Sequence, residues 1–168
     1  ARQQDHSEPQ KLAFNISPIR QLMSKGKIGG GIDAAIAKTA ALTKTLSAEF
    51  PAATSLEVEA LSVHEAGGSE AQELAALMAG AVDLLRRLDQ VGLSPKEAAP
   101  QILFRLAVDA NYGIGIAKLR AARRLWARVQ DALGVTPQPM LLHAVSSARM
   151  LTRYDGWVNM LRGSAACF

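Results

Sequence analysis

The chain has 168 residues, of which 49% are hydrophobic and 20% charged, so it can form one domain with a core of ordinary globular composition. Its single cysteine, Cys167, excludes a disulfide within the chain, and no apolar run approaches the ~20 residues of a membrane-spanning helix. The net charge of +4 allows attraction to anions but is too small to indicate nucleic-acid binding. We therefore expect a cytoplasmic globular protein that has no membrane partner.

The first third of the sequence predicts an arm followed by helices. Residues 1–16 are polar at their start, which is typical of a loose arm. Ser17-Pro18 is a helix-start signal, because proline is favoured at the first helical position. An apolar stripe with three- and four-residue spacing from Ile32 to Phe50 predicts a second helix, for which Asp33 is the expected cap. We interpret residues 17–50 as a helical lead-in to the rest of the domain.

From residue 51 onward the sequence alternates between strand and helix patterns. Alternating polar and apolar residues predict a strand that begins at Leu56, and apolar runs predict two more strands over 102–108 and 140–145. Long amphipathic segments separate these strands, which favours parallel pairing with crossover helices. The predicted fold class is α/β, with residues 51–168 forming about three βα units of a partial (β/α)8 TIM barrel behind the N-terminal helices.

Capping signals mark several of the helix starts. Ser69 with Gln72, and Ser94 with Glu97, have the spacing of capping boxes, and Asp155 can cap a last helix. Three parallel strands are too few to close a barrel, and they leave two sheet edges unpaired. We therefore expect the chain to be part of something larger or to be completed by another chain.

Polar side chains gather where the predicted strands run into helices, which is where barrel proteins place their functional residues. The candidates for substrate binding are His64, His143, Ser146 and Ser147. An imidazole at this position can act as a general acid or donate a hydrogen bond; alternatively, local backbone or Glu65 satisfies His64. No second His or Cys stands at metal-ligand spacing and the serines lack a Gly-x-Ser-x-Gly context, so we predict neither a metal site nor a hydrolase triad.

A row of arginines lies on one predicted helix. Arg120, Arg124 and Arg128 are spaced by four residues, so they share a face. Such a stripe could bind nucleic acid, but no aromatic side chains alternate with the arginines to stack on bases. We interpret the stripe as a solvated or inter-subunit face, and we expect no nucleic-acid partner.

Three strings resemble segments of methylmalonyl-CoA mutases. They are His-Glu-Ala-Gly-Gly-Ser-Glu-Ala-Gln-Glu-Leu over 64–74, Ile-Ala-Lys-Leu-Arg-Ala-Ala-Arg-Arg-Leu-Trp-Ala-Arg over 116–128, and Asp-Gly-Trp-Val-Asn-Met-Leu-Arg over 155–162. The strings occur in the right order, each at a strand–helix unit. The similarity covers roughly residues 50–168 well and the first 50 residues weakly.

The resemblance implies a (β/α)8 barrel that binds an acyl-CoA thioester, and a separate domain that binds adenosylcobalamin. In that family the cofactor starts a radical rearrangement of methylmalonyl-CoA to succinyl-CoA. The family's cobalamin motif, Asp-x-His-x-x-Gly, does not occur in this sequence. We therefore expect this chain alone to bind no cofactor and to be inactive.

Departures from the pattern of the catalytic subunits indicate which type of subunit the sequence resembles most. Catalytic subunits read His-Met-Gln-Glu-Ala-Gly at the first junction, and alignment on Glu65 places Ser62 at the histidine position. On the third strand, the positions of an arginine and a serine that contact CoA hold Leu141 and Ala144. An apolar residue in place of arginine removes an ion pair to the ligand. The sequence therefore resembles the non-catalytic small (beta) subunit most, and we assign no catalytic residue.

Three hypotheses of function follow. The first is a structural barrel segment that supports a catalytic mutase subunit, or associates with itself, to complete the barrel. The second is a part of an active cobalamin-dependent acyl-CoA mutase whose other segments are absent here, for which weak binding of acyl-CoA would be expected. The third, remote hypothesis is a basic nucleic-acid-binding module.

Overall fold

A four-stranded parallel sheet forms the centre of the computed structural model, which describes residues 12–168. Its strands are adjacent in chain order: β1 (Ala13–Ile16), β2 (Thr54–Glu59), β3 (Ile102–Val108) and β4 (Leu141–Ser146). Glu59 is paired with Arg105, which in turn is paired with His143, so these three residues lie in a row across the sheet. The predicted class, a parallel α/β fragment of a barrel, is confirmed.

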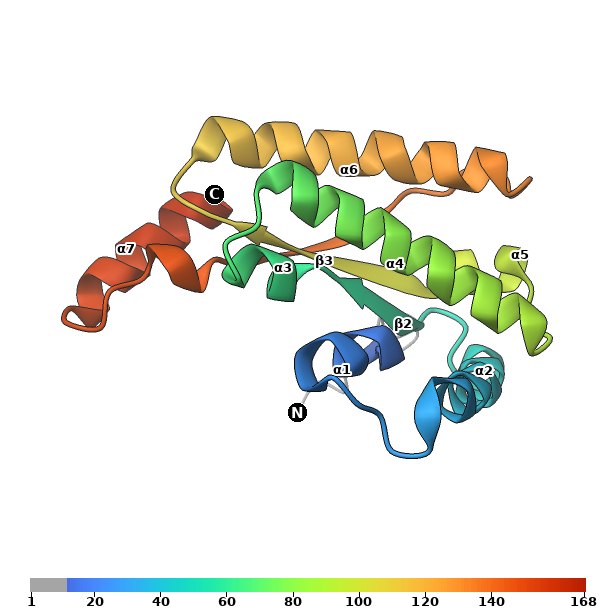
Figure 1. Ribbon diagram of the computed structural model, residues 1–168. Helices are drawn as coiled ribbons and strands as arrows, with labels where there is room; N and C mark the ends of the chain where they lie inside the picture. The colour runs from blue at the N-terminus through green and yellow to red at the C-terminus, as the bar shows by residue number, and fades with distance from the viewer. Residues whose placement is uncertain (1–11) are drawn as a thin grey trace, which may run out of the picture.

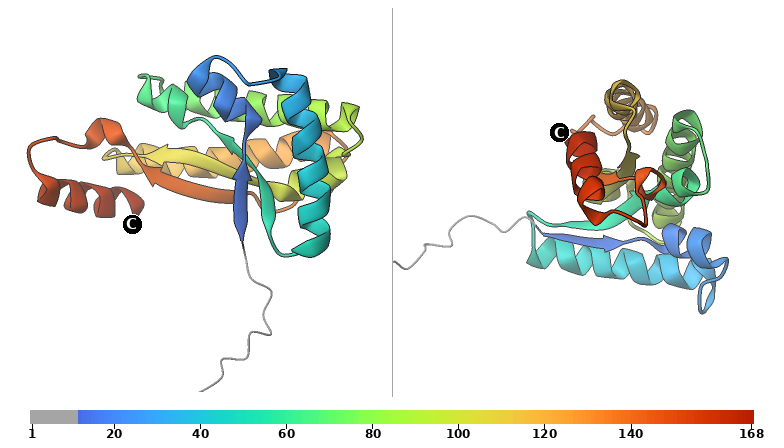
Figure 2. Two further views of the ribbon diagram at one scale, coloured as in Figure 1. Left: turned by 90° about the horizontal axis from the view of Figure 1, so that it is seen from below. Right: turned by 90° about the vertical axis from the view of Figure 1, so that its left-hand side faces the viewer.

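Seven α-helices and two short 3₁₀ turns connect and flank the strands in this part of the chain. They are α1 (Pro18–Lys25), α2 (Gly31–Glu49), α3 (Leu61–Glu65), α4 (Glu70–Gln90), α5 (Pro95–Ala98), α6 (Tyr112–Ala132) and α7 (Gly156–Cys167), with 3₁₀ turns at Ala99–Gln101 and Ala148–Met150. The helices α4 and α6 lie side by side along the sheet (Figure 1). The end-on view in Figure 2 shows α6, α4 and α2 following one another around the sheet, while α7 lies beside β4 on another side. Among residues 12–168, no helix has the length and apolar character needed to cross a bilayer.

The strand β1 occupies the end of the segment that the sequence predicted to be a loose arm. Ala13 pairs with Thr54 and Ile16 with Leu56, so β1 adds a fourth strand to the three expected. The strand is short and half exposed, and Asn15 within it has a φ of 53°. Such a strand has almost no alternating pattern, which explains why its pairing with β2 could not be read from the sequence. The rest of the predicted arm, residues 1–11, lies outside the described residues.

The turn after β2 is tighter than the sequence suggested. The apolar–polar alternation that begins at Leu56 predicts a strand, but this strand already ends at Glu59 and α3 begins two residues later. The end of α3 depends on a close approach of backbone, because a Cβ on Gly68 would come within 2.7 Å of the Val63 carbonyl oxygen. A glycine is therefore required there. This turn brings His64 back over the end of the sheet.

The helix starts follow the predicted capping signals with one exception. The Ser69 hydroxyl accepts from Gln72 N, and Asp155 accepts from Trp157 N and Val158 N. Glu97 accepts from both Ser94 N and Ser94 Oγ. Asp33 does not cap α2 as predicted, because α2 already begins at Gly31 behind Gly30, which has a φ of 81°.

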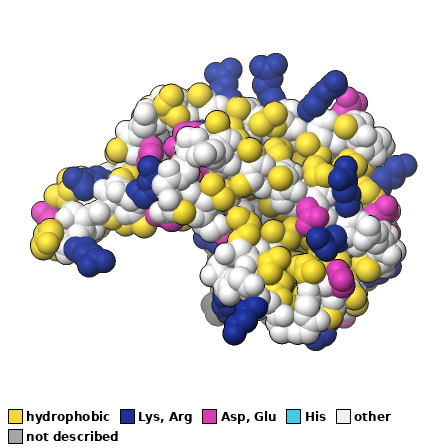
Figure 3. All heavy atoms as spheres, in the orientation of Figure 1, with side chains coloured by type: hydrophobic (Ala, Val, Ile, Leu, Met, Phe, Trp, Pro, Cys, Tyr) yellow, Lys and Arg dark blue, Asp and Glu magenta, His cyan; other side chains and the backbone are white. Residues whose placement is uncertain are grey.

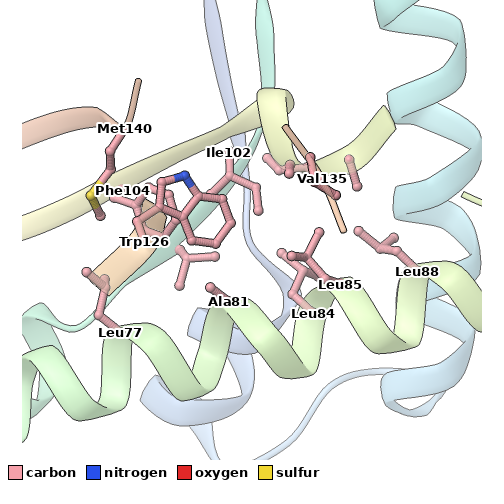
Figure 4. Packing of buried hydrophobic residues seen from close by; sticks show 14 of the residues in the cluster. Leu77, Ala81, Leu84, Leu85, Leu88, Ile102, Phe104, Trp126, Val135 and Met140 are labelled. Carbon is pink, nitrogen blue, oxygen red and sulfur yellow. The ribbon is translucent and has the colours of Figure 1, made fainter. Parts of the chain in front are cut away.

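The core lies between the sheet and the helices α2, α4 and α6. Phe104 of β3 packs against Trp126 of α6 with ring centroids 4.7 Å apart in an edge-to-face arrangement. Leu77 and Ala81 of α4 lie beside this pair, and further apolar residues of α4 continue the core toward Val135 (Figure 4). With few aromatic residues in the chain, Trp126 provides a large share of the buried volume, and it is only 2% exposed.

Replacement of Trp126 by Ala is expected to lower the free energy of unfolding by about 3–5 kcal/mol, because it leaves a cavity against Phe104. Urea denaturation followed by circular dichroism measures the change. Leu125→Ala is the matched control on the same helix, since Leu125 is 43% exposed, and it should cost less than about 1 kcal/mol. Equal losses in both variants would show that α6 does not pack on the sheet through this face.

Candidate functional site at the carboxyl ends of the strands

Three fully buried polar side chains meet where β2 and β4 end. His64 Nε2 lies 2.7 Å from Ser147 Oγ, and His64 Nδ1 lies 3.4 Å from a carboxylate oxygen of Glu73. His64 follows β2, Ser147 follows β4 and Glu73 lies in the first turns of α4. None of the three is exposed to solvent. Two of the predicted candidates, His64 and Ser147, are thus brought together across 83 residues of sequence.

A buried ion pair continues this row. Lys118 Nζ lies 2.7 Å from Glu73 Oε2 and also contacts the carboxylate of Glu70. The other oxygen of Glu73 accepts from the backbone N of Ala107 at 2.8 Å, at the end of β3. Glu73 therefore joins α4 to β3, to α6 through Lys118 and to the turn after β2 through His64. We call Ser147, His64, Glu73, Lys118 and Glu70 the polar relay.

Two hydrogen bonds meet at Ser147 Oγ. It accepts from the backbone N of Arg149 at 3.2 Å and is bonded to His64 Nε2 at 2.7 Å. The Nδ1 atom has no partner within hydrogen-bond geometry among the described residues.

The order serine–histidine–carboxylate is that of a hydrolase relay, but the surroundings do not suit acyl transfer. Ser147 is fully enclosed, so no carbonyl carbon can reach its hydroxyl in this structure. The carboxylate of Glu73 is paired with Lys118, which leaves it little capacity to stabilise an imidazolium. The chemistry available to the polar relay is therefore hydrogen bonding between strand ends, which fixes their relative positions.

His64, Glu70 and Glu73 also have the composition of a metal site, with ligand atoms within 4.8 Å of one another. The Lys118 ammonium contacts both carboxylates of this group, so it provides the positive charge that a divalent cation would bring. A lysine in this place competes directly with any metal for the same oxygens. The sequence missed this group because Glu70 and Glu73 are not at a metal-ligand spacing from His64.

A second set of contacts ties the loop after β4 to the loop after β2. Glu65 Oε1 accepts from the backbone N of Ala148 at 2.9 Å. Arg149 donates to the carbonyl oxygens of His64 at 3.0 Å and Gly68 at 3.2 Å. The alternative in which Glu65 satisfies the His64 ring is wrong, because Ser147 and Glu73 face that ring instead.

The other two predicted candidates lie elsewhere on β4. His143 is exposed and stands beside Arg105 in the row across the sheet, away from the polar relay. Ser146 Oγ lies 3.2 Å from Cys167 Sγ of α7.

The sequence contained a signal for Glu73 and Lys118, the two residues of the polar relay that the sequence analysis missed. Glu73 and Lys118 are charged residues on the otherwise apolar faces of two amphipathic helices, and a buried charge requires a partner.

The face of the sheet opposite α4 and α6, which we call the inner face, carries a second charged cluster. Glu57 is fully buried; its carboxylate lies 3.2 Å from Arg20 of α1 and 3.6 Å from Arg105 of β3. Glu59 follows on the same side of β2 and borders a cavity of about 620 Å³ between α1 and α2. Burial raises the pKa of Glu59 above its usual value, opposed by the charge of Arg20 and reinforced by Glu57.

The fold and the site together define a class of protein. Parallel strands with helices packed around one side, open sheet edges and polar side chains at the carboxyl ends are features of a segment of a β/α barrel. Comparison with known proteins identifies which barrel. The sequence profile of the family described as methylmalonyl-CoA mutase matches residues 6–168, so the chain belongs to this family.

Individual relatives are subunits of these mutases. The methylmalonyl-CoA mutase small subunit of Streptomyces virginiae is 48% identical over 132 residues, which are 78% of this chain and 21% of that protein. A probable small subunit of Mycobacterium tuberculosis is 43% identical over 67% of this chain and 18% of its own length. The large subunit of Propionibacterium freudenreichii subsp. shermanii is 34% identical over 69% of this chain and 16% of its own length. The chain thus spans about a fifth of the length of these curated relatives.

A double-mutant cycle is expected to show strong coupling between Glu73 and Lys118. Lys118→Met alone should lower the free energy of unfolding by about 3–5 kcal/mol, because it leaves a buried carboxylate without its cation, and Glu73→Gln should cost a similar amount. The double variant should lose clearly less unfolding free energy than the two single variants lose together. Urea unfolding of the four proteins gives the coupling, with Lys44→Met, at an exposed lysine, as the control. Additive losses would contradict the ion pair.

Stability is expected to depend on pH through Glu59. Because its folded pKa is raised, the folded state holds its proton more tightly than the unfolded chain. This contribution is present at low pH and is lost as the pH rises from about 4.5 through the raised value. Glu59→Gln should therefore unfold at higher urea than the parent at pH 7, and the gap should close toward pH 4. Glu49→Gln, at an exposed position, is the control. A difference in urea midpoint that widens toward low pH would mean that the pKa of Glu59 is lowered rather than raised.

Proposed function

We propose that this chain is a barrel segment of a non-catalytic, small-subunit-like protein that supports the isomerisation of methylmalonyl-CoA to succinyl-CoA by a catalytic partner. The observation that carries the proposal is the polar relay. His64 and Ser147, at the ends of β2 and β4 where a barrel enzyme would contact its substrate, are bonded to each other and closed to solvent. The small-subunit relatives support the same assignment.

The inner face supports the proposal independently. An acyl-CoA bound along a barrel axis would need the inner face to be open to it. Glu57 and Arg105 place opposite charges there, 3.6 Å apart, and Glu57 is fully buried. At the sheet edge, the position where the resemblance expects an arginine for CoA is Leu141, which is 43% exposed and offers no charge. These positions of the inner face and the sheet edge thus provide little to hold a CoA phosphate or a thioester carbonyl.

The family cofactor does not fit the described residues of this chain. Ligation of the cobalt by a histidine needs an accessible ring nitrogen, and both nitrogens of His64 are enclosed by Ser147 and Glu73. His143 is exposed, but it stands on the sheet beside Arg105 rather than in a cradle. We therefore assign adenosylcobalamin to the catalytic partner. A cytoplasmic location stays a prediction from composition.

The competing hypothesis, an active mutase segment, makes a different prediction about ligand binding. If this chain contributed to an active site, it should retain some affinity for methylmalonyl-CoA. Under our proposal, isothermal titration of the chain with methylmalonyl-CoA gives no binding heat, and His64→Ala leaves the titration unchanged. Saturable binding that is lost in His64→Ala would replace our proposal with the enzymatic one.

Association with a catalytic subunit is the direct test. Native mass spectrometry of the chain mixed with the large subunit of Streptomyces virginiae, a relative that is 32% identical over 69% of this chain, should show a complex of the two. Self-association of this chain would also complete the open sheet edges. A compact monomer that forms no complex with the large subunit would overturn the proposal.

A further inference from the structure

The cavity between α1 and α2 is separate from the polar relay, and its walls come from four elements of the fold. Its volume of about 620 Å³ lies within the range of roughly 300–1,000 Å³ that is common for small-molecule sites. The walls are the end of β1, α1, α2 and, through Glu59, the end of β2. In Figure 1 α1 and α2 occupy the lower part of the molecule, and Figure 3 shows Lys and Arg side chains projecting at its lower margin. We call this space the α1–α2 cavity.

A buried carboxylate forms the inner wall of the α1–α2 cavity. Glu59 is only 9% exposed, and among residues 12–168 its carboxylate is in no ion pair within 4.0 Å. Burial raises its pKa, whereas the charges of Arg20 and Arg105 and a hydrogen bond from the backbone N of Leu61 favour its ionised form. Both arginines already flank Glu57, at 3.2 and 3.6 Å. Since buried charges are normally paired, Glu59 is the group of this cavity that a cation from a ligand would satisfy.

Two lysines line the outer part of the same cavity. Lys25 lies at the end of α1 and Lys38 lies on α2, and both are exposed. Neither is in an ion pair among residues 12–168, because the ion pair beside the cavity joins Arg20 to Glu57 instead. The charge along the cavity therefore changes from one buried carboxylate inside to two unpaired ammonium groups outside.

Uncharged groups complete the walls. Thr39 is buried on α2, and its Oγ1 donates to the carbonyl oxygen of Ala35 at 2.9 Å, so its lone pairs are available to a donor. Ile16 and Pro18 offer apolar contact to a short carbon skeleton. A molecule that is complementary to all of these groups carries a cation for Glu59 and an anion for the lysines, joined by a few carbon atoms.

We propose that the α1–α2 cavity binds a small zwitterion of the amino-acid class. The ammonium group of the ligand pairs with the Glu59 carboxylate, and the ligand carboxylate pairs with Lys25 and Lys38 in charge-assisted hydrogen bonds. A simple anion would meet the buried charge of Glu59, and a simple cation would lie beside two lysines. This site is additional to the support of a catalytic subunit and does not depend on it.

NMR titration of the isotope-labelled chain at pH 7 with glycine, β-alanine and γ-aminobutyrate tests the site. These probes separate their two charges by increasing lengths, whereas propionate and ethylammonium each carry only one of the charges. We expect saturable shifts at the backbone amides of Thr39 and Glu59 with at least one of the three amino acids. The ions with a single charge should bind at least about tenfold more weakly, because each leaves one half of the site unpaired.

Two variants examine the two halves of the site. Glu59→Gln, which we expect to be folded and more stable than the parent at pH 7, should weaken binding of the amino acid at least about tenfold. Lys25→Met with Lys38→Met should weaken it by a similar factor. The matched controls are Glu49→Gln, and Lys44→Met with Lys96→Met, which make the same changes of charge at exposed positions outside the cavity. Both controls should bind as the parent does.

The outcomes that contradict the site are distinct from those that contradict the proposed function. An absence of saturable binding by all three amino acids would overturn the site, as would equal affinity of the parent and Glu59→Gln. Propionate or ethylammonium that binds as tightly as the best amino acid would also overturn it, because one charge would then be sufficient. None of these results changes whether the chain forms a complex with the large subunit, which tests the proposed function.

Discussion

The buried pair between Glu73 and Lys118 is the interaction on which the arrangement of this molecule depends. Two charges out of contact with water are costly unless each is paired and hydrogen-bonded, and here one carboxylate is shared among three partners. Glu73 contacts Lys118 of α6, the backbone N of Ala107 at the end of β3, and the ring of His64 after β2. Since an apolar substitute could not contact all three in fixed directions, the pair determines how the βα units are oriented at their carboxyl ends.

The same constraint explains why two of the four candidate residues, His64 and Ser147, are enclosed. His64 and Ser147 stand at the ends of β2 and β4, which is where a barrel enzyme would present a proton donor and a hydroxyl. In this structure each is the nearest partner of the other, 2.7 Å apart and without solvent exposure. Opening this contact would leave a buried imidazole next to a carboxylate, which carries a large free-energy cost. The contact between these two side chains therefore stabilises the ends of β2 and β4 relative to each other.

Much of the fold could be predicted from the sequence, because strong apolar periodicity and capping signals are local. The strand over 102–108 has the bounds that were predicted, and the starts at Ser69 and Asp155 are capped as expected. The strand β1 was missed because four residues with little alternation gain their structure from pairing with β2 rather than from their own pattern. At the site, Lys118 and Glu73 were missed because their pairing joins residues 45 positions apart. The positions of Glu73 and Lys118 on apolar helix faces indicated that each needs a partner, but they did not identify that partner.

The two charged clusters also differ in what they require of a neighbour. In the polar relay every carboxylate has a cation or a donor within the described residues, so nothing further has to approach it. On the inner face, both oxygens of Glu57 lack a hydrogen-bond partner although the side chain is buried, and so does Arg105 Nε. Unsatisfied buried groups are rare in complete domains. The inner face therefore holds most of the buried polar atoms of the two clusters that lack a partner, whereas in the polar relay only His64 Nδ1 lacks one among the described residues.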